Sequence, residues 1–282
     1  MPEDIYADNM SRDLVEAQRL DEQFTLLTSN IGYLLHPLIA SALPPKPHVA
    51  DIGTGTGIFL RRMHDLYPEA TLHGYDISAD LYPEPQTLPS NMRLSTLDVK
   101  APIPPELHGA YDLVHVRLLA AAMLPAEWAI VVRNVSRLLK PGGYIQWVEC
   151  DFSGVKHMRG RPESTFASAR LMGTAFREAL RERFEHGWST LPRELEAAGG
   201  LKCVHEDVVS SDRVPETRAR MTRNGMVAIF KWAHLMTARN VPGSFSLDRL
   251  AQLKEEVEAD IESGCYVRFD IYIACGQRPH SS

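Results

Sequence analysis

The segment from Val49 to Gly57, Val-Ala-Asp-Ile-Gly-Thr-Gly-Thr-Gly, constrains the fold of this chain more than any other. A short apolar run passes through an acid into three alternating glycines, Gly53, Gly55 and Gly57. Glycine adopts positive φ freely and has no Cβ, so a ligand can lie directly against the peptide groups. The helix that follows such a loop points its free N–H groups at the ligand. The segment therefore predicts a strand, a ligand-binding loop and a helix, although a turn without a ligand would have the same composition.

The chain beyond this segment alternates apolar runs of strand length with helical stretches, which is typical of parallel βαβ units. A stop signal, Lys140-Pro141-Gly142-Gly143, predicts the end of one helix just before a strand. Three prolines between Ser78 and Asn91 predict an extended loop where a helix would usually cross. We expect strands near 48–52, 71–76, 92–97, 111–116 and 143–149, and helices near 57–67 and 126–139.

Helical regions flank this α/β series on both sides. Residues 11–42 have helical periodicity and an apolar stripe that runs from Leu14 to Leu38. The C-terminal part predicts helices over 163–198, 216–239 and 247–262, the last with Ser246 as its N-cap. Strands are expected at 202–210 and 266–274. We divide the chain into a helical extension (1–44), a core (45–210), a helical insertion (211–264) and a final strand with its tail (265–282). The extension and the insertion are expected to form an apolar lid over a small hydrophobic substrate.

Composition narrows the class of protein. A chain of 282 residues with 44% hydrophobic content can bury one substantial core. Its net charge of −6 argues against nucleic acid as a partner, since phosphate backbones require clustered basic residues. The apolar runs are too short to span a bilayer and the N-terminus lacks the features of a signal peptide, so we expect a soluble, cytoplasmic protein. Neither a metal site nor disulfides are expected, because the four cysteines are widely spaced and interpreted as reduced core thiols: Cys150, Cys203, Cys265 and Cys275.

The spacing of the glycines bears on the ligand. A dinucleotide fingerprint, G-x-G-x-x-G, requires a third glycine where this chain has Ile58 or Leu60. Asp51 lies two residues before the first glycine, where it would repel a pyrophosphate. An acid there suits a ligand with a cationic amino group, such as the methionine half of S-adenosylmethionine (SAM).

The ends of the next strands carry further candidate ligand-binding groups. Asp76 follows the glycines by about 20 residues, where its carboxylate could accept hydrogen bonds from both hydroxyls of a ribose. Ile77 could lie against an adenine ring, and Asp98, followed by Val99, could accept from the adenine amino group. Acids also favour strand ends as turn residues. His115, near the end of the fourth strand, is expected to contact the cofactor or to satisfy a backbone carbonyl.

Together these residues resemble the class I, Rossmann-like SAM-dependent methyltransferases over about residues 45–150. A narrower resemblance, to fungal small-molecule methyltransferases of secondary metabolism and a related regulator, rests on residues 16–23, the proline-rich loop and His115-Val116-Arg117. The resemblance implies a seven-stranded, mostly parallel sheet with its last strand antiparallel. It also implies that Tyr6, Arg19 and Gln23 close over the cofactor, although the last two could form a surface pair one helical turn apart. The full cofactor-binding set is Tyr6, Arg19, Gln23, Asp51, Gly53, Thr54, Gly55, Gly57, Asp76, Ile77, Asp98, Val99 and His115.

The function expected from this resemblance is methyl transfer to a small, hydrophobic metabolite, at oxygen or nitrogen. His157 and His234 are the candidate general bases, although the neighbours of His234 are also typical of a helix in a core. Motifs for methylating amides, adenine or cytosine are missing. A non-methylating cyclase or a regulatory protein on the same fold is the alternative.

Overall fold

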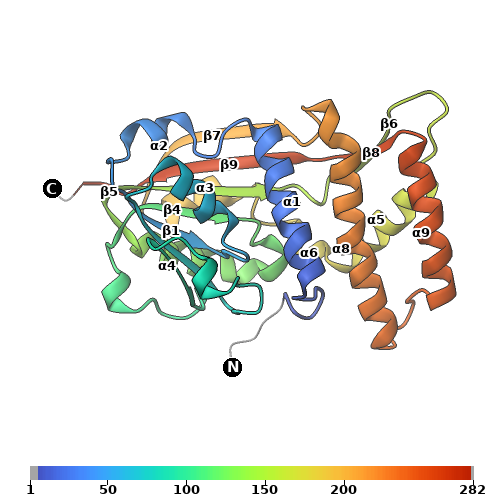
Figure 1. Cartoon of the computed structure of the whole chain (residues 1–282), viewed down its shortest axis with the longest axis horizontal. Helices are drawn as coiled ribbons and strands as arrows, with labels where there is room; N and C mark the ends of the chain where they lie inside the picture. Colours follow the sequence, from blue (N-terminus) through green and yellow to red (C-terminus); the bar gives the residue numbers. More distant parts are fainter. Residues whose placement is uncertain (1–5, 281–282) are drawn as a thin grey trace.

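The computed structural model describes residues 6–280, so the first five residues of the N-terminus, where no signal peptide is expected, lie outside it. Seven strands form one sheet in the order β3-β2-β1-β4-β5-β9-β7 (Figure 1). Strands β1 to β5 run parallel, and β9 runs antiparallel to both of its neighbours, β5 and β7. The α/β fold with an antiparallel late strand is therefore confirmed. The strands are β1 (His48–Ile52), β2 (Thr71–Asp76), β3 (Met92–Thr96), β4 (Tyr111–Arg117), β5 (Leu139–Cys150), β7 (Lys202–Ser210) and β9 (Asp270–Gln277).

The described helices lie close to the predicted ranges. Asp13 begins the first helix by accepting a hydrogen bond from the Glu16 amide, and Ser246 caps the last by accepting from the Arg249 amide, as predicted. No helix among residues 6–280 is both long and apolar enough to cross a membrane. The helices are α1 (Leu14–Ile31), α2 (Pro37–Ala42), α3 (Ile58–Leu66), α4 (Trp128–Arg137), α5 (Ala167–Ala179), α6 (Arg181–Phe184), α7 (Leu191–Ala197), α8 (Arg218–Ala238) and α9 (Leu247–Glu262).

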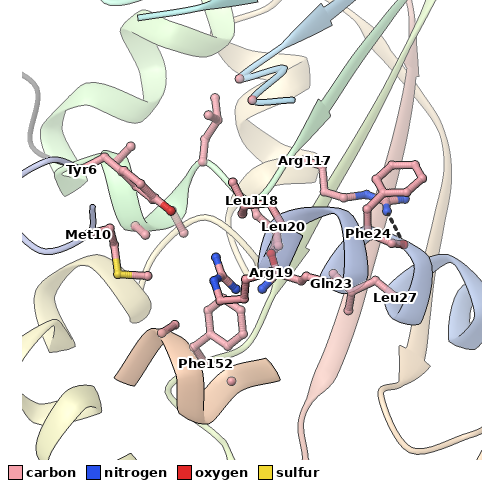
Figure 2. Close-up of a pocket in the computed structure, with 18 of the residues that line it drawn as sticks. Tyr6, Met10, Arg19, Leu20, Gln23, Phe24, Leu27, Arg117, Leu118 and Phe152 are labelled. Atoms are coloured by element: carbon pink, nitrogen blue, oxygen red, sulfur yellow. Dashed lines mark hydrogen bonds between the residues drawn. The ribbon is translucent and has the colours of Figure 1, made fainter. Parts of the chain in front are cut away.

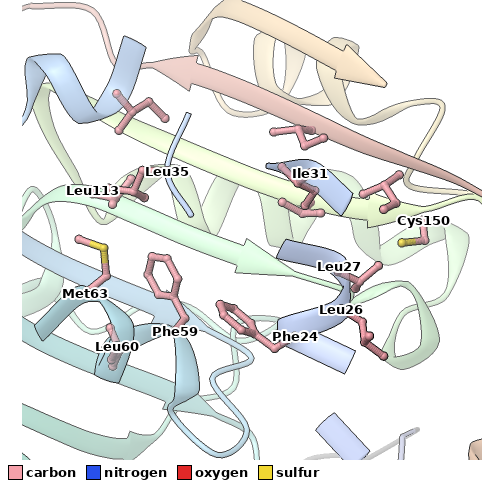
Figure 3. Packing of buried hydrophobic residues seen from close by; sticks show 14 of the residues in the cluster. Phe24, Leu26, Leu27, Ile31, Leu35, Phe59, Leu60, Met63, Leu113 and Cys150 are labelled. Carbon is pink, nitrogen blue, oxygen red and sulfur yellow. The ribbon is translucent and has the colours of Figure 1, made fainter. Parts of the chain in front are cut away.

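Apolar side chains fill both faces of the sheet. On one face Phe24, Leu27 and Ile31 of α1 pack with Phe59 of α3 and Leu113 of β4 (Figure 3). On the other face α4 packs on β5 and α7 packs on β7 and β9, in a cluster that includes Trp128, Val131, Trp147, Leu191 and Leu195. Because both faces are covered, the central strands are apolar along most of their length.

A third apolar cluster lies at the far end of the molecule, where α5, α8 and α9 pack together as a helical cap (Figure 1). Met172 of α5, Trp232 of α8 and Leu253 of α9 belong to it. Helix α5 therefore belongs to the cap, although the division from the sequence assigns its residues to the core (45–210).

The last predicted strand is corrected by the structure, which has two strands in place of one. β8 (Cys265–Arg268) pairs with β6 (Lys156–Arg159) in a separate two-stranded sheet, and β9 then joins the main sheet. Between them the Phe269 amide donates to Ser211 Oγ (3.0 Å), and the Ser211 amide donates to the Phe269 carbonyl (2.9 Å). Alternation of apolar residues continues through this point, so the pattern alone could not reveal that the pairing partner changes.

Three smaller expectations are also corrected. Leu14 and Leu38, at the ends of the predicted apolar stripe, are 73% and 50% exposed. β5 already begins at Leu139, so the Lys-Pro-Gly-Gly turn lies within its first residues. Cys203 is only partly buried, because it lies near the edge of the sheet on β7, whereas the other three cysteines are buried; all four are free thiols.

Candidate functional site

The glycine loop leaves β1 at the centre of the sheet and enters α3. Gly53, Gly55 and Gly57 all have positive φ, at 67°, 53° and 75°, as the sequence predicts. The Thr54 amide donates to the Tyr75 carbonyl (3.0 Å), and the Gly57 amide donates to the Thr54 carbonyl (2.8 Å). These bonds fix the loop against β2.

Asp51 lies beneath this loop and is almost completely buried. One of its oxygens accepts from Thr54 Oγ1 (2.7 Å), and the other lies 2.7 Å from His115 Nδ1. A carboxylate accepts only, so Nδ1 carries the proton. The His115 ring stacks on Phe59, with 3.7 Å between centroids, and its Nε2 is buried without a partner. Burial lowers the pKa of His115, against the opposing effect of Asp51, and a neutral ring then keeps a free acceptor at Nε2. The bond to Asp51 was not among the sequence-based alternatives for His115.

The two strand-end acids lie on the same side of the loop. Asp76 accepts from the Gly55 amide (2.9 Å) and, at 3.4 Å, from the Ser78 amide, while burial raises its pKa. Asp98 accepts from the Lys100 amide (2.9 Å). Each carboxylate thus accepts a hydrogen bond from an amide in the turn that follows it. Each residue also lines a cavity.

This cavity, of about 320 Å³, runs from the glycine loop to the underside of α1 and α8. Its lining includes Arg19 and Gln23 of α1 and Tyr6, which precedes that helix. Figure 2 shows them together with Phe24, Leu118 and Phe152. Twelve of the thirteen sequence-predicted cofactor residues line it; Gly57 does not, because it lies at the start of α3, behind the loop. Of the two histidine candidates, His157 lines the cavity, whereas His234 is exposed on α8 and does not.

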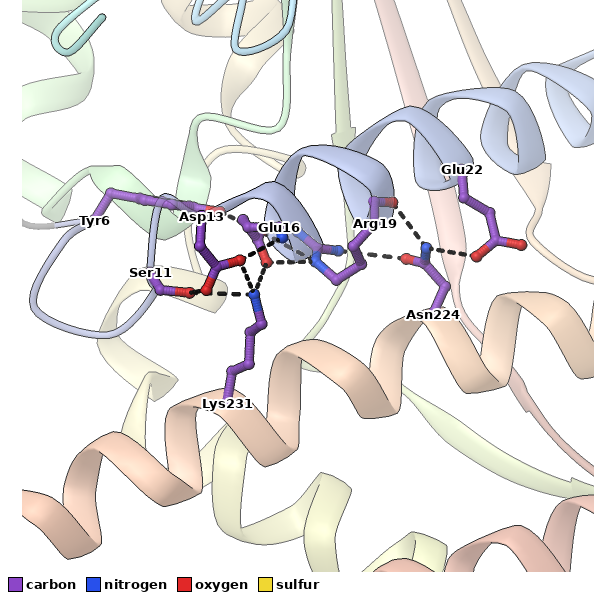
Figure 4. Close-up of polar contacts among 8 residues, drawn as sticks. All are labelled: Tyr6, Ser11, Asp13, Glu16, Arg19, Glu22, Asn224 and Lys231. Atoms are coloured by element: carbon purple, nitrogen blue, oxygen red, sulfur yellow. Dashed lines mark hydrogen bonds and ion pairs between the residues drawn. The ribbon is translucent and has the colours of Figure 1, made fainter. Parts of the chain in front are cut away.

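The side of the cavity beneath α1 is held by a buried polar network that joins α1 to α8 (Figure 4). Glu16 is fully buried and accepts from Arg19 Nε and Nη2, at 2.6 to 3.0 Å, and from the Tyr6 hydroxyl (3.0 Å). Lys231 of α8 adds a positive charge 3.7 Å from Glu16, and Asn224 donates to the Arg19 carbonyl (2.8 Å). Arg19 is therefore buried and paired with Glu16 in this structure. It is neither free to close over the cofactor nor part of a surface pair.

A second buried acid, Glu149, shapes the cavity from the end of β5. Its carboxylate accepts from the indole Nε1 of Trp147 (2.8 Å) and from the amides of Leu119 (2.9 Å) and Ala120 (3.4 Å). Those amides belong to the loop after β4, which lines the cavity and begins with Leu118 at φ 57°. Burial raises the pKa of Glu149 to about 7. Sequence reasoning missed this residue; the available signal was an acid at the end of an otherwise apolar strand.

His157 lies on β6, with its Nε2 buried and without a partner. Burial, with Arg177 and Arg170 nearby, lowers its pKa to about 4, so the ring is neutral at neutral pH. Gly173 of α5 makes room for the ring, since a Cβ there would lie 2.9 Å from Cε1 and Nε2 of His157.

Comparison with known proteins assigns the fold to a class. Residues 50–145 match the family model of a methyltransferase domain. A solved structure, phosphoethanolamine N-methyltransferase 2 of Haemonchus contortus in complex with SAM, shares the fold with a TM-score of 0.51 at 12% identity, over 92% of this chain and 52% of that one. Residues 50–145 thus match a methyltransferase domain, and the chain has the Rossmann-like α/β fold of the solved methyltransferase structure.

Several relatives are fungal proteins that are named methyltransferases. Methyltransferase grgD of Penicillium sp is 40% identical over 144 residues, which are 48% of this chain and 50% of that protein. N-methyltransferase sirN of Leptosphaeria maculans is 33% identical over 150 residues, 53% of this chain and 51% of that protein. The chain therefore spans about half the length of these relatives. Methyltransferase str2 of Strobilurus tenacellus is 27% identical over 270 residues, 91% of this chain and 92% of that protein.

Proposed function

We propose that this protein transfers a methyl group from SAM to a small, mostly apolar metabolite, at a nitrogen or an oxygen atom. The observation that carries the proposal is that the glycine loop, Asp76 and Asp98 converge on one cavity whose remaining walls are largely apolar. A volume of about 320 Å³ falls within the range of small-molecule sites. The net charge of −6 supports a small molecule rather than nucleic acid, and we place the reaction in the cytoplasm.

The residues present fit the cofactor. Bare peptide at Gly53 and Gly55 accommodates the methionine half, and the carboxylates of Asp76 and Asp98 keep acceptor capacity for the ribose hydroxyls and the adenine amino group. Ile77 offers an apolar contact to the adenine ring. When bound, SAM supplies a methyl group that its sulfonium already activates. The protein then has to align the acceptor atom and exclude water.

The acceptor atom is tied to the state of His157, the candidate base that lines the cavity. Its pKa of about 4 makes it a weak base, so it would contribute little to deprotonating a hydroxyl. The nitrogen of a neutral amine already has a free lone pair and needs only a route for the proton that it loses after transfer. This favours nitrogen as the methylated atom, and the relative sirN, named an N-methyltransferase, supports the same choice.

We also propose that the helical extension (1–44) and the helical insertion (211–264) act as the lid over this cavity. The network of Glu16, Arg19 and Asn224 supports this role, because it fastens α1 to α8 directly above the cavity.

Calorimetry with S-adenosylhomocysteine (SAH) tests the cofactor assignment. Wild type should bind SAH, and Asp76→Ala should bind it at least tenfold more weakly, because the variant lacks the acceptor for the ribose hydroxyls. Asp65→Ala, an exposed acid on α3, is the matched control and should bind as wild type does. Absence of SAH binding by the wild type would refute the proposed function.

Incubation of candidate metabolites with methyl-labelled SAM tests the reaction itself. Label in the product is expected. An isomerised product without label would instead establish the cyclase alternative.

A further inference from the structure

Arg117, the last residue of β4, has no role in the cofactor contacts proposed above. It lines the cavity, and its guanidinium carbon lies 4.3 Å from the centroid of the Phe24 ring, which covers it from α1 (Figure 2). In register, Ile52 of β1 pairs with Val116, so Arg117 lies level with the start of the glycine loop. It also pairs with Val148 of β5. Arg117 is thus placed between the glycine loop and the end of β5.

The hydrogen bonds of Arg117 use only one of its three nitrogen atoms. Nη1 donates to Thr28 Oγ1 (3.1 Å) and, at 3.4 Å, to the Phe24 carbonyl. Nε and Nη2 are buried and have no partner. These two atoms form the side-on edge of the guanidinium, whose parallel N–H groups match the two oxygens of a carboxylate.

Arg19 shows the same edge in use within this protein. Its Nε and Nη2 both donate to the Glu16 carboxylate, at 2.6 to 3.0 Å. No carboxylate among residues 6–280 forms an ion pair with Arg117. Asp51 acts on Arg117 electrostatically, but its two oxygens are engaged by Thr54 and His115.

Because Arg117 is charged, burying Nε and Nη2 without a partner is energetically costly. Burial lowers its pKa only to about 10, so the guanidinium stays protonated at neutral pH. A buried charge without a counter-ion destabilises the folded protein unless a partner or a ligand compensates it. The cation–π contact with Phe24 and the two bonds of Nη1 compensate it in part.

We propose that Nε and Nη2 of Arg117 bind a carboxylate group of a ligand in this cavity. The proposal rests on the proposed function, and it specifies a carboxylate as the group that the cofactor or the acceptor places beside Arg117. The carboxylate can come from the methionine half of the cofactor or from the acceptor. Because Nε and Nη2 are enclosed, the incoming carboxylate displaces side chains beside them, and Phe24 is the one that both covers the guanidinium and lines the cavity.

Pairs of ligands, of which one member bears a carboxylate and the other lacks it, test this inference on the chain of 282 residues. The first pair is SAH and 5′-methylthioadenosine, which lacks the amino-acid half. The second pair is 2-naphthoate and 2-naphthamide, measured with and without SAH. Arg117→Met should weaken the acid member of at least one pair by about tenfold to a hundredfold and leave the neutral member within twofold. Loss confined to SAH assigns the carboxylate to the cofactor, and loss confined to naphthoate assigns it to the acceptor.

Two further variants separate recognition from stability. Arg117→Lys keeps the charge without the two-pronged edge and should retain only part of the preference for the acid; it replaces Arg117→Met if that variant unfolds. Thr28→Val removes one of the two acceptors of Nη1, leaves Nε and Nη2 unchanged, and should preserve the wild-type preference. Unchanged acid-to-neutral affinity ratios in both Arg117 variants would overturn the inference while leaving SAH binding, and with it the proposed function, intact. A wild type that binds neither nucleoside would contradict the proposed function instead.

Discussion

Glu149 illustrates how burial sets the charge of single residues around the cavity. Three donors, the Trp147 indole and the amides of Leu119 and Ala120, stabilise its ionised form, yet burial outweighs them and raises the pKa from 4.5 to about 7. The same carboxylate fixes the loop that carries Leu119, whose side chain packs against Gly53. Glu149 thereby connects the end of β5 to the glycine loop.

The raised pKa predicts a pH dependence of stability. Between pH 4.5 and 7 the folded protein holds a proton on Glu149 that the unfolded chain has released, so this contribution is complete below pH 4.5 and is lost as the pH rises through 7. The free energy of unfolding should fall by about 3 kcal/mol over this range through Glu149. Glu149→Gln cannot ionise, so chemical denaturation at pH 4.5 and pH 8 should show the difference between wild type and variant changing by about that amount. An equal difference at both pH values would contradict the assignment; other titrating groups, such as His157, cancel in the comparison.

Gly53 provides a second prediction at this scale. Its φ is 67°, and a Cβ on it would lie 2.7 Å from Leu119 Cδ2. Gly53→Ala should lower the free energy of unfolding by about 1–2 kcal/mol, because alanine disfavours this backbone conformation, and it should also weaken SAH binding. Gly225→Ala is the matched control for denaturation: it lies within α8, has no atom within 4 Å of its would-be Cβ, and should stabilise by about 0.5–1 kcal/mol. Equal effects of the two substitutions on stability would be inconsistent with this account.

At the scale of elements, α1 owes its position to a buried ion pair as much as to its apolar face. Phe24, Leu27 and Ile31 pack on the sheet, while Glu16 and Arg19 face α8. A surface pair of Arg19 and Gln23, which the helical spacing also allowed, would not have supplied this buried contact with α8.

Removing Glu16 should therefore cost far more than removing an acid from a surface pair. Glu16→Ala leaves Arg19 buried without its counter-ion and should lower the free energy of unfolding by about 3–5 kcal/mol. Glu258→Ala breaks the exposed pair with Arg223 between α9 and α8 and should cost less than about 1 kcal/mol. Urea denaturation of the two variants beside the wild type measures both values, and a Glu16→Ala loss as small as that of Glu258→Ala would show that the network is not a structural tie.

At the scale of the whole molecule, the cavity lies where the sheet, α1 and the cap of α5, α8 and α9 meet. Binding of SAH should slow amide hydrogen exchange in α1, because Arg19 and Gln23 line the cavity from that helix. The C-terminal half of α4, on the opposite face of the sheet, should not change and serves as the internal control. Equal protection of α1 and α4 would point to global stabilisation in place of lid closure.

The order and type of the elements followed from local signals. Strand lengths, the glycine loop, the prolines of 78–91 and the cap at Ser246 each depend on residues close together in the chain, so sequence reasoning placed them well. The exchange of pairing partner at Phe269 and the membership of α5 in the cap depend on residues far apart, and local patterns carry no information on them.

The sequence by itself determined an α/β sheet with a glycine loop and acids at the ends of its strands, because steric limits on glycine and the geometry of parallel strands act locally. Only the tertiary structure decided which charges are compensated. It paired Glu16 with Arg19, placed Asp51 against His115, enclosed Glu149, exposed His234 and left Nε and Nη2 of Arg117 buried without a partner. The strength of each charge depends on burial and on partners from distant segments, and these exist only once the chain has folded.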